Sequence, residues 1–259
     1  MDGPRTDAGL TALSVTPLAP LPAVRPGAEL ARLVAEAAPG DLGDGDVLVV
    51  AHKVVSKAEG RTRRLDEIEP GERARGLARE HHKDARLVQA VLDESAEVLR
   101  AVDGTLICVT HHGLVCANAG VDQSNASAEG ELVLLPRDPD RSAARLRAGI
   151  AELVGVRPAV VIADSFGRAW RLGQTDVAIG VAGLVPLDQW IGRPDAFGRE
   201  LRVTSIAVAD CVAAAADLAR AKDSLEPVVL VRGLERYVTP GDGPGATALR
   251  RPPEQDLFR

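Results

Sequence analysis

The feature that most constrains this chain is a short apolar run followed at once by a dense group of polar residues. Residues Ala159–Ala163 are all Ala, Val or Ile, which is typical of a strand buried on both faces. The next segment, Asp164–Asp176, reads Asp-Ser-Phe-Gly-Arg-Ala-Trp-Arg-Leu-Gly-Gln-Thr-Asp. Strand ends often carry metal and phosphate chemistry, because the strand is rigid and the loop after it can vary. We therefore predict a functional loop over Asp164–Asp176.

A second oxygen-rich segment lies upstream, at Ala117–Asn125. Two such loops together with Arg168 and Arg171 indicate a hard cation that holds an anionic, phosphorylated ligand. An isolated Asp beside a turn is as often a helix cap or an Asx-turn, and an isolated Arg is ordinarily a solvated charge. The prediction therefore depends on the whole pattern and not on any one of its members.

The residue types suggest how a nucleotide could be held. Asp122 and Asp164 are the best candidates for metal ligands, with the Ser165 hydroxyl as a third oxygen donor. A triphosphate also needs nearby cations, which Lys57 and either Arg168 or Arg171 could supply. Gly167–Thr175 does not have the spacing of a P-loop, and Gln174 stands where that loop would place its lysine. Any nucleotide must therefore be bound in another way.

Composition limits the classes of partner. The formal net charge is −6 and aromatic residues make up only 2% of the 259 residues. An acidic surface argues against nucleic acids and anionic membranes as partners, and the shortage of aromatic rings argues against binding single strands by base stacking. There is no apolar signal segment at the N-terminus and no run long enough to span a membrane. We expect a cytoplasmic protein with reduced cysteines.

The pattern along the chain predicts an α+β fold with mixed sheets and flanking helices, and it allows two subdomains. Strands are expected at residues 14–18, 47–51, 106–110, 132–135, 159–163 and 228–231, and helices at residues 29–38, 72–101, 141–154 and 212–221. Asp140 is expected to cap the third of these helices. Residues 1–12 are predicted to be a disordered leader, 13–237 one domain, and 238–259 a loosely ordered tail or linker rich in Gly and Pro.

Together, several segments resemble the coenzyme F420-0:L-glutamate ligases, the γ-glutamyl ligases of deazaflavin biosynthesis. The similarity extends from about Val15 to Gly233. The segments that carry it are residues 44–50, 53–60, 119–125, 164–176, 197–201 and 227–233.

The resemblance implies the fold of that family and a GTP-dependent ligase that uses two divalent ions, Mn²⁺ or Mg²⁺. Such a ligase would couple L-glutamate to the lactyl carboxylate of F420-0 and then add further glutamate through a γ-linkage. In each addition the carboxylate would be activated as an acyl phosphate. Asp122, Asp164 and Ser165 would bind metal, while Arg168 and Arg171 would hold either the phosphates or the acceptor and the incoming glutamate. The residues expected to contact GTP are Pro20, Leu21, Pro22, Ala23, His52, Lys57, Asn125 and a segment from about Lys222 to Arg232.

The chain departs from the family pattern at a few of these positions. Ser165 replaces a common threonine and keeps its hydroxyl, whereas Ala23 and His52 replace a glutamate and a serine. Lys222 stands where many relatives have an acid or an amide, and a charged lysine cannot bind a metal. Relatives are homodimers, which predicts a homodimer here.

Two other interpretations remain open. One is a nucleotide- or deazaflavin-binding module without turnover, for which Lys222 is the main argument. The other is a ligase domain that needs a nitroreductase-like domain or protein to build long glutamate tails, because the end of the chain, Pro252–Arg259, resembles the junction of such fusions.

Overall fold

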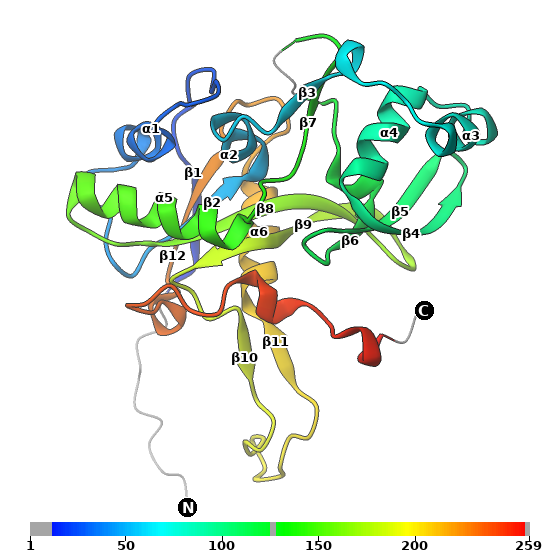
Figure 1. Ribbon diagram of the computed structural model, residues 1–259. Helices are drawn as coiled ribbons and strands as arrows, with labels where there is room; N and C mark the ends of the chain where they lie inside the picture. Colours follow the sequence, from blue (N-terminus) through cyan, green and yellow to red (C-terminus); the bar gives the residue numbers. More distant parts are fainter. Residues whose placement is uncertain (1–11, 125–127, 257–259) are drawn as a thin grey trace, which may run out of the picture.

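The computed structural model describes residues 12–124 and 128–256, and its centre is a five-stranded mixed sheet (Figure 1). The strand order is β1-β12-β2-β8-β9, in which β2 and β8 run parallel and all other neighbours are antiparallel. Such a sheet confirms the predicted α+β class with mixed sheets. Its strands are β1 (Ser14–Pro17), β2 (Val47–Ala51), β8 (Ala159–Arg168), β9 (Arg171–Ala182) and β12 (Val228–Arg232).

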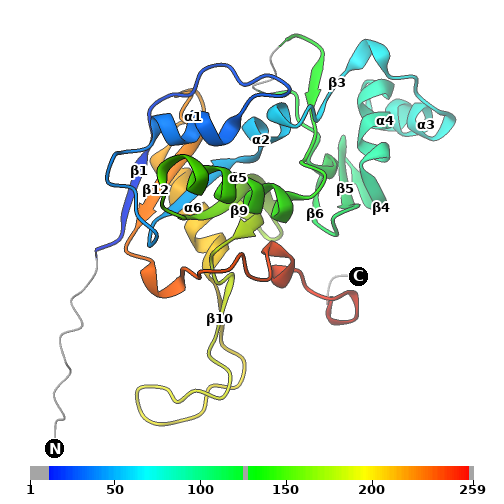
Figure 2. The same cartoon turned by 60° about the vertical axis from the view of Figure 1, so that its left-hand side comes forward.

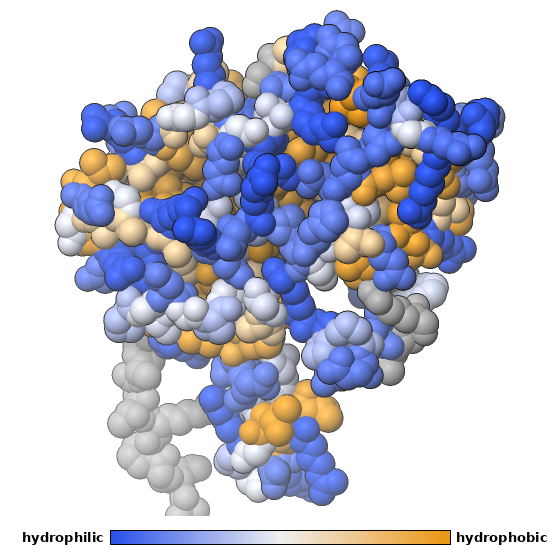
Figure 3. All heavy atoms as spheres, in the orientation of Figure 1, coloured by the Kyte–Doolittle hydropathy of each residue, from blue (hydrophilic) through white to orange (hydrophobic). Residues whose placement is uncertain are grey.

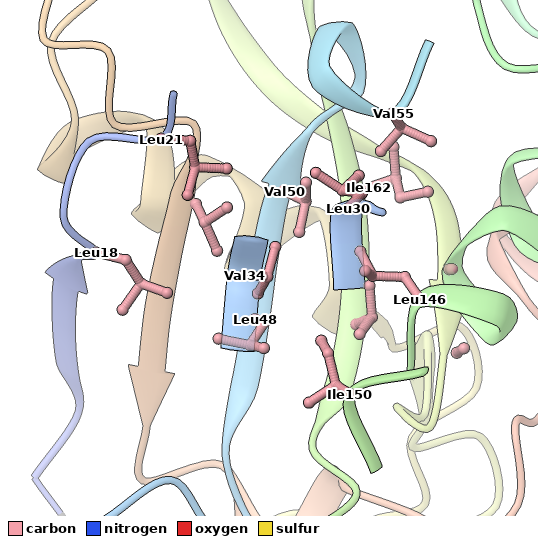
Figure 4. Close-up of a cluster of buried hydrophobic side chains, with 14 of the residues drawn as sticks. Leu18, Leu21, Leu30, Val34, Leu48, Val50, Val55, Leu146, Ile150 and Ile162 are labelled. Carbon is pink, nitrogen blue, oxygen red and sulfur yellow. The ribbon is translucent and has the colours of Figure 1, made fainter. Parts of the chain in front are cut away.

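Helices cover both faces of this sheet because its strands are apolar on both sides. Leu48 and Val50 belong to a core cluster with α1 (Leu30–Ala37) and α5 (Pro139–Val154), as the labelled side chains of Figure 4 show. Val47 and Val49 point the other way, into a second cluster with α6 (Val208–Ala219). The turned view in Figure 2 shows α1 and α5 lying together over the sheet. The short helix α2 (His52–Ala58) continues directly from the end of β2.

A second lobe follows α2 and has a core cluster of its own, in which Val91, Leu106 and Leu132 are buried. It lies beside the main sheet in Figure 1. This separate core is compatible with the two subdomains that the sequence pattern allows. Its elements are β3 (Thr62–Arg64), η1 (Leu65–Glu67), α3 (Glu72–His81), α4 (Ala85–Asp93), β4 (Ser95–Val102), β5 (Thr105–Thr110), β6 (Val115–Ala117), the short helix η2 (Asn118–Gly120) and β7 (Glu131–Val133).

The single helix predicted over residues 72–101 is wrong. The first helix ends at His82, which adopts a left-handed conformation with φ 53°, and the Asp84 side chain caps the next helix by accepting a hydrogen bond from the Arg86 backbone N–H. From Ser95 the chain is a strand, β4, which pairs with β5 through a turn at Asp103–Gly104, where both residues have positive φ.

The predicted cap at Asp140 is also wrong. Asp138 caps α5 by accepting from the Arg141 N–H, while Asp140 accepts from the backbone N–H groups of Val181 and Ala246. Asp140 therefore ties the C-terminal segment to α5 and β9. Within this segment, Ala246 is 2% exposed. The segment contains η3 (Glu235–Tyr237), η4 (Ala246–Leu249) and η5 (Pro253–Gln255).

A two-stranded arm, β10 (Leu187–Gln189) and β11 (Ser205–Ala207), projects from the body, and the face in Figure 3 shows apolar atoms on it among hydrophilic ones. The connecting loop exposes Phe197 and Val203, whose exposed fractions are 89% and 87%. Across residues 12–124 and 128–256, no helix combines the length and the apolar character needed to cross a membrane.

Candidate active site

The centre of the candidate site is the place on the main sheet where β2 ends beside β8, which continues past it. The two strands are parallel, with Ala51 opposite Ala163, so the residues that follow them, His52 and Asp164, are neighbours. His52 Nε2 lies 3.2 Å from Asp164 Oδ1, and the His52 side chain is only 2% exposed. This Nε2 makes no aligned hydrogen bond within the described residues, while Nδ1 lies 3.4 Å from Ser56 Oγ. A buried nitrogen without an aligned partner needs an explanation, and a catalytic role or a bound ion is one.

The next residue of α2 reaches the second predicted acid. Lys53 Nζ lies 2.6 Å from Asp122 Oδ2 and also donates to Ser124 Oγ. The Asp122 loop is fixed to the second lobe, because Asp122 exchanges two backbone hydrogen bonds with Val133. Burial raises the pKa of Asp122, but hydrogen bonds from Lys53 and Ser124 outweigh it, and the net pKa lies below the ordinary value. Asp122 is therefore a carboxylate at neutral pH.

Two consecutive residues of α2 thus contact the two carboxylates that were predicted to bind metal. His52 lies beside Asp164 on the main sheet, and Lys53 pairs with Asp122 on the second lobe. The Cys116 thiol of β6 also lies close enough to Asp164 to be affected by its charge: burial raises the pKa of Cys116 to about 12, and Asp164 contributes to that rise. Both lobes therefore contribute to this edge.

Ser165, the third predicted metal ligand, belongs to a network of hydrogen bonds and ion pairs. Ser165 Oγ donates to Asp176 Oδ1 at 2.6 Å and accepts from Lys222 Nζ at 2.8 Å. The Asp176 side chain is fully buried and also pairs with the Arg220 guanidinium. Lys222 additionally donates to Asp217 Oδ1 of α6 at 2.9 Å. Ser165 is therefore already hydrogen-bonded on both sides.

Two of the segments expected to contact GTP lie at the same edge. The loop after β1 reaches it because the Leu21 N–H donates to the Leu225 carbonyl, close to Lys222 in the chain. Pro20, Pro22 and Ala23 of this loop are exposed, whereas Leu21 is buried in the core. Lys57 lies on α2; burial lowers the pKa of its ammonium, as does the nearby charge of Lys53, while Glu131 opposes the shift.

Other predicted residues lie elsewhere. Asp164–Asp176 is not a loop: β8 continues to Arg168 and pairs with β9, so Arg168 and Arg171 are exposed at the tip of a hairpin. At about 3.3 Å per residue this tip is roughly 13 Å along the strand from Asp164. Arg232 lies at the opposite end of β2, where it pairs with Asp41 and Asp46, and the structure does not bring it to this edge. Asn125 lies outside the described residues.

Sequence reasoning did not identify Lys53 or Arg220, although both bind predicted residues directly. Lys53 stands four residues before Lys57 on α2, and this i, i+4 spacing is the signal that could have paired them on one helix face. Nothing local distinguishes Arg220, because its partner Asp176 is distant in sequence.

Comparisons with known proteins agree with the resemblance seen in the sequence. The sequence model of the F420-0:Gamma-glutamyl ligase family matches residues 19–233. The chain is 45% identical to a Coenzyme F420:L-glutamate ligase of Methanopyrus kandleri over 97% of this chain and 99% of that protein. It is also 45% identical to the protein of that name from Archaeoglobus fulgidus, over 95% of this chain and 96% of the relative.

The chain belongs to the F420-0:gamma-glutamyl ligase family. A third relative with the same name, from Haloarcula marismortui, is 44% identical over 92% of this chain and 93% of its own length. The match covers both lobes and the arm, so it includes every described residue of the candidate site. Membership makes this chain an enzyme of the ligase class.

The family resemblance implies divalent ions, and the residues at the edge fit one of them. Asp164 offers hard carboxylate oxygens and faces the His52 nitrogen that has no aligned partner. Asp122 offers them as well, but Lys53, which lies 2.6 Å from its Oδ2, must move aside before an ion can bind there. Within the described part of the chain, no three His, Cys, Asp or Glu side chains gather into a cage of their own. Mg²⁺ is usually bound in proteins by one or two carboxylates plus phosphates and water, so it needs no such cage. A second ion at Ser165 does not fit, since the Lys222 ammonium is bonded there.

Proposed function

We propose that this ligase attaches L-glutamate to coenzyme F420-0, first at the lactyl carboxylate and then through a γ-linkage. GTP and divalent Mn²⁺ or Mg²⁺ take part in the reaction. The observation that carries the proposal is the 45% identity over nearly the whole chain to proteins named Coenzyme F420:L-glutamate ligase. The geometry is compatible with it, because carboxylates and ammonium groups converge at one edge of the sheet.

A carboxylate is a poor electrophile, so it must be activated before an amine can attack it. In the proposed reaction a carboxylate oxygen of F420-0 attacks the γ-phosphorus of GTP, and GDP leaves. The glutamate amine then attacks the resulting acyl phosphate; the C–N bond forms, the C–O bond to phosphate breaks, and inorganic phosphate leaves with the amine's proton lost to solvent. Positioning and electrostatics do most of this work, and no protein nucleophile is needed.

The chain's own residues supply the positioning. Lys57 and Lys53 lie on one helix, and the exposed loop residues Pro20, Pro22 and Ala23 lie at the same edge. We assign Lys57 to the phosphates because its ammonium is partly desolvated, which strengthens its attraction to an anion. Asp164 and Asp122 would hold the divalent ion, and that ion, when bound, offsets negative charge on the γ-phosphate.

Arg168 and Arg171 remain candidates for binding an anionic substrate, but from a distance. Both are exposed at the hairpin tip, and Arg168 Nη2 donates to the Leu172 carbonyl across the turn. They are better placed to hold an extended acceptor than to touch the phosphates near Asp164. Replacing Arg171 with Ala should therefore raise the KM for F420-0 more than the KM for GTP.

We also propose that the enzyme is a homodimer in which the arm takes part. The loop of the arm exposes Phe197 and Val203 almost completely, and large apolar side chains on a projecting arm are typical of an interface. Analytical ultracentrifugation of the wild type and of a Phe197→Asp variant tests this. A wild-type monomer at micromolar concentration would contradict it.

The deciding experiment is a mass-spectrometric assay of purified protein with F420-0, L-glutamate, GTP and Mn²⁺. We expect stepwise addition of glutamyl units that needs both metal and GTP. Asp164→Asn should abolish it, whereas Asp103→Asn, an isosteric change of an exposed acid in the β4–β5 turn, should leave it intact. If GTP binds but no product forms, the chain is a binding module. If only one unit is added until a nitroreductase-like protein is supplied, the partner-dependent ligase is correct.

A further inference from the structure

The Lys222 ammonium lies in a cradle of three oxygen atoms that come from three different elements. Its Nζ is 2.8 Å from Ser165 Oγ of β8 and 2.9 Å from Asp217 Oδ1 of α6. Asp176 Oδ1 of β9 lies 3.8 Å away. A hydroxyl and two carboxylates around one point are hard oxygen ligands of the kind that a divalent cation takes in proteins. In this chain the Lys222 ammonium, and not a metal ion, lies between these three oxygen atoms.

The hydrogen bonds around the cradle leave little capacity for an added ion. The Ser165 hydroxyl gives its hydrogen to Asp176 Oδ1 and accepts from Lys222 on its oxygen. The other oxygen of Asp176 is paired with Arg220, and the Asp176 side chain is fully buried. A divalent ion at Ser165 would therefore meet two fixed positive groups within a few ångströms, and like charges at that separation repel strongly where water is partly excluded.

We propose that Lys222 is a fixed cation that takes the place of a second divalent ion, so that each active site holds a single divalent ion, on the Asp164 side. This inference rests on the proposed function, because a nucleotide-dependent ligase needs positive charge at this edge. The ammonium performs part of that work without coordination chemistry. It stays at the site because Asp217 and Ser165 hold it there.

The exposure of Lys222 indicates what else it does. Its side chain is 68% exposed, although its ammonium is bonded to Ser165 and Asp217. A substrate can therefore approach the ammonium from the solvent side, whereas Asp176 behind it is inaccessible. The chemistry that suits such a position is an anionic oxygen, either of a phosphate or of a carboxylate, which the ammonium would meet as a point charge.

Counting bound ions tests the proposal directly. Free Mn²⁺ is measured by electron paramagnetic resonance while Mn²⁺ is titrated into enzyme that is saturated with a non-hydrolysable GTP analogue. We expect one tightly bound Mn²⁺ per chain in the wild type and two in Lys222→Asp, which replaces the cation with an oxygen ligand. Arg145→Asp makes the same change in net charge on an exposed part of α5 and should bind one. Circular dichroism confirms that each variant is folded.

Steady-state kinetics distinguishes a Lys222 whose charge takes part in the reaction from a Lys222 that only stabilises the fold. Lys222→Met should lower kcat/KM by about tenfold or more and still bind one Mn²⁺, while Lys222→Arg should retain most activity. Two bound ions in the wild type, or an unchanged count in Lys222→Asp, would overturn the proposal, and so would full activity in Lys222→Met. Wild-type enzyme with the expected ion counts but no glutamylation would refute the proposed function, while the finding that Lys222 excludes a second ion would still hold.

Discussion

Arg147 provides the sharpest test of how the fold is held together. It is an arginine in the middle of α5 whose side chain is only 1% exposed. Its guanidinium donates to the carbonyls of Pro158 at 3.0 Å and Thr239 at 2.7 Å, and to Asp242 Oδ1 at 2.8 Å. One helix thereby fixes both the approach to β8 and the segment after β12.

Replacing Arg147 with Met keeps an unbranched apolar stem, shortens the side chain by the guanidinium group and removes every donor. A buried acceptor left without a partner costs about 1–3 kcal/mol. The Pro158 carbonyl should incur the full cost because it is buried, whereas the Thr239 carbonyl is partly buried and Asp242 is 42% exposed, so their losses are smaller. We expect the free energy of unfolding to fall by about 3–5 kcal/mol in total. For a chain of this size that corresponds to a decrease in Tm of roughly 10 °C.

The assay is urea unfolding followed by far-ultraviolet circular dichroism, with Arg145→Met as the matched control. Arg145 is exposed on the same helix, so its replacement should change the free energy of unfolding by no more than about 0.5 kcal/mol. Limited proteolysis should release the segment after Thr239 in the Arg147 variant first. A loss below about 1 kcal/mol with an unchanged m-value would refute the reasoning, because the carbonyls would then be satisfied in another way.

Three further outcomes are expected. Gly120→Ala should lower the free energy of unfolding, measured in thermal melts, by about 1–3 kcal/mol. Gly120 has φ 71°, and an added Cβ would lie 2.7 Å from the Leu135 side chain. An unchanged free energy of unfolding would show that the turn before Asp122 can relax. Iodoacetamide near neutral pH should modify exposed Cys211 well before buried Cys116, because burial raises the pKa of the Cys116 thiol to about 12. Mass spectrometry that finds Cys116 alkylated first would contradict its burial. Nucleotide binding at alkaline pH should be accompanied by proton uptake, because burial lowers the pKa of Lys57 in the free enzyme and a bound phosphate would raise it. Calorimetry in buffers of different ionisation enthalpy measures the number of protons taken up. Binding without proton uptake would show that Lys57 does not contact the phosphates.

The sequence predicts the main sheet well because its strands are nearly uniform apolar runs. The runs 47–51, 159–163 and 228–231 form β2, the start of β8, and β12. It fails over residues 72–101, where charged residues with helical spacing continue into β4. The signal against one long helix is Asp103-Gly104, a dipeptide favoured in two-residue hairpin turns, and both residues do adopt positive φ. Local turn chemistry therefore overrides the helical pattern that precedes it.

The same limit applies to Asp164–Asp176. Polar residues after a buried strand suggest a loop, yet β8 runs on to Arg168 because β9 pairs with it, with register shifts at Ile162/Ala163 and Gly167/Arg168. The pairing places Ser165 opposite Asp176, which explains why these two residues bond, and it moves Arg168 and Arg171 away from Asp164. A strand's length depends on its partner, and the partner is not visible in the local pattern.

What the sequence cannot supply is the pairing of charges between lobes. Asp122 and Asp164 are recognisable as acids beside turns, but their neighbours His52 and Lys53 lie far from both in the chain. They become partners only because β2 ends beside Ala163 of β8 and α2 starts there, so that two successive side chains of one helix turn toward different lobes. Lys53 is thus a link between the lobes as well as a charge at the site.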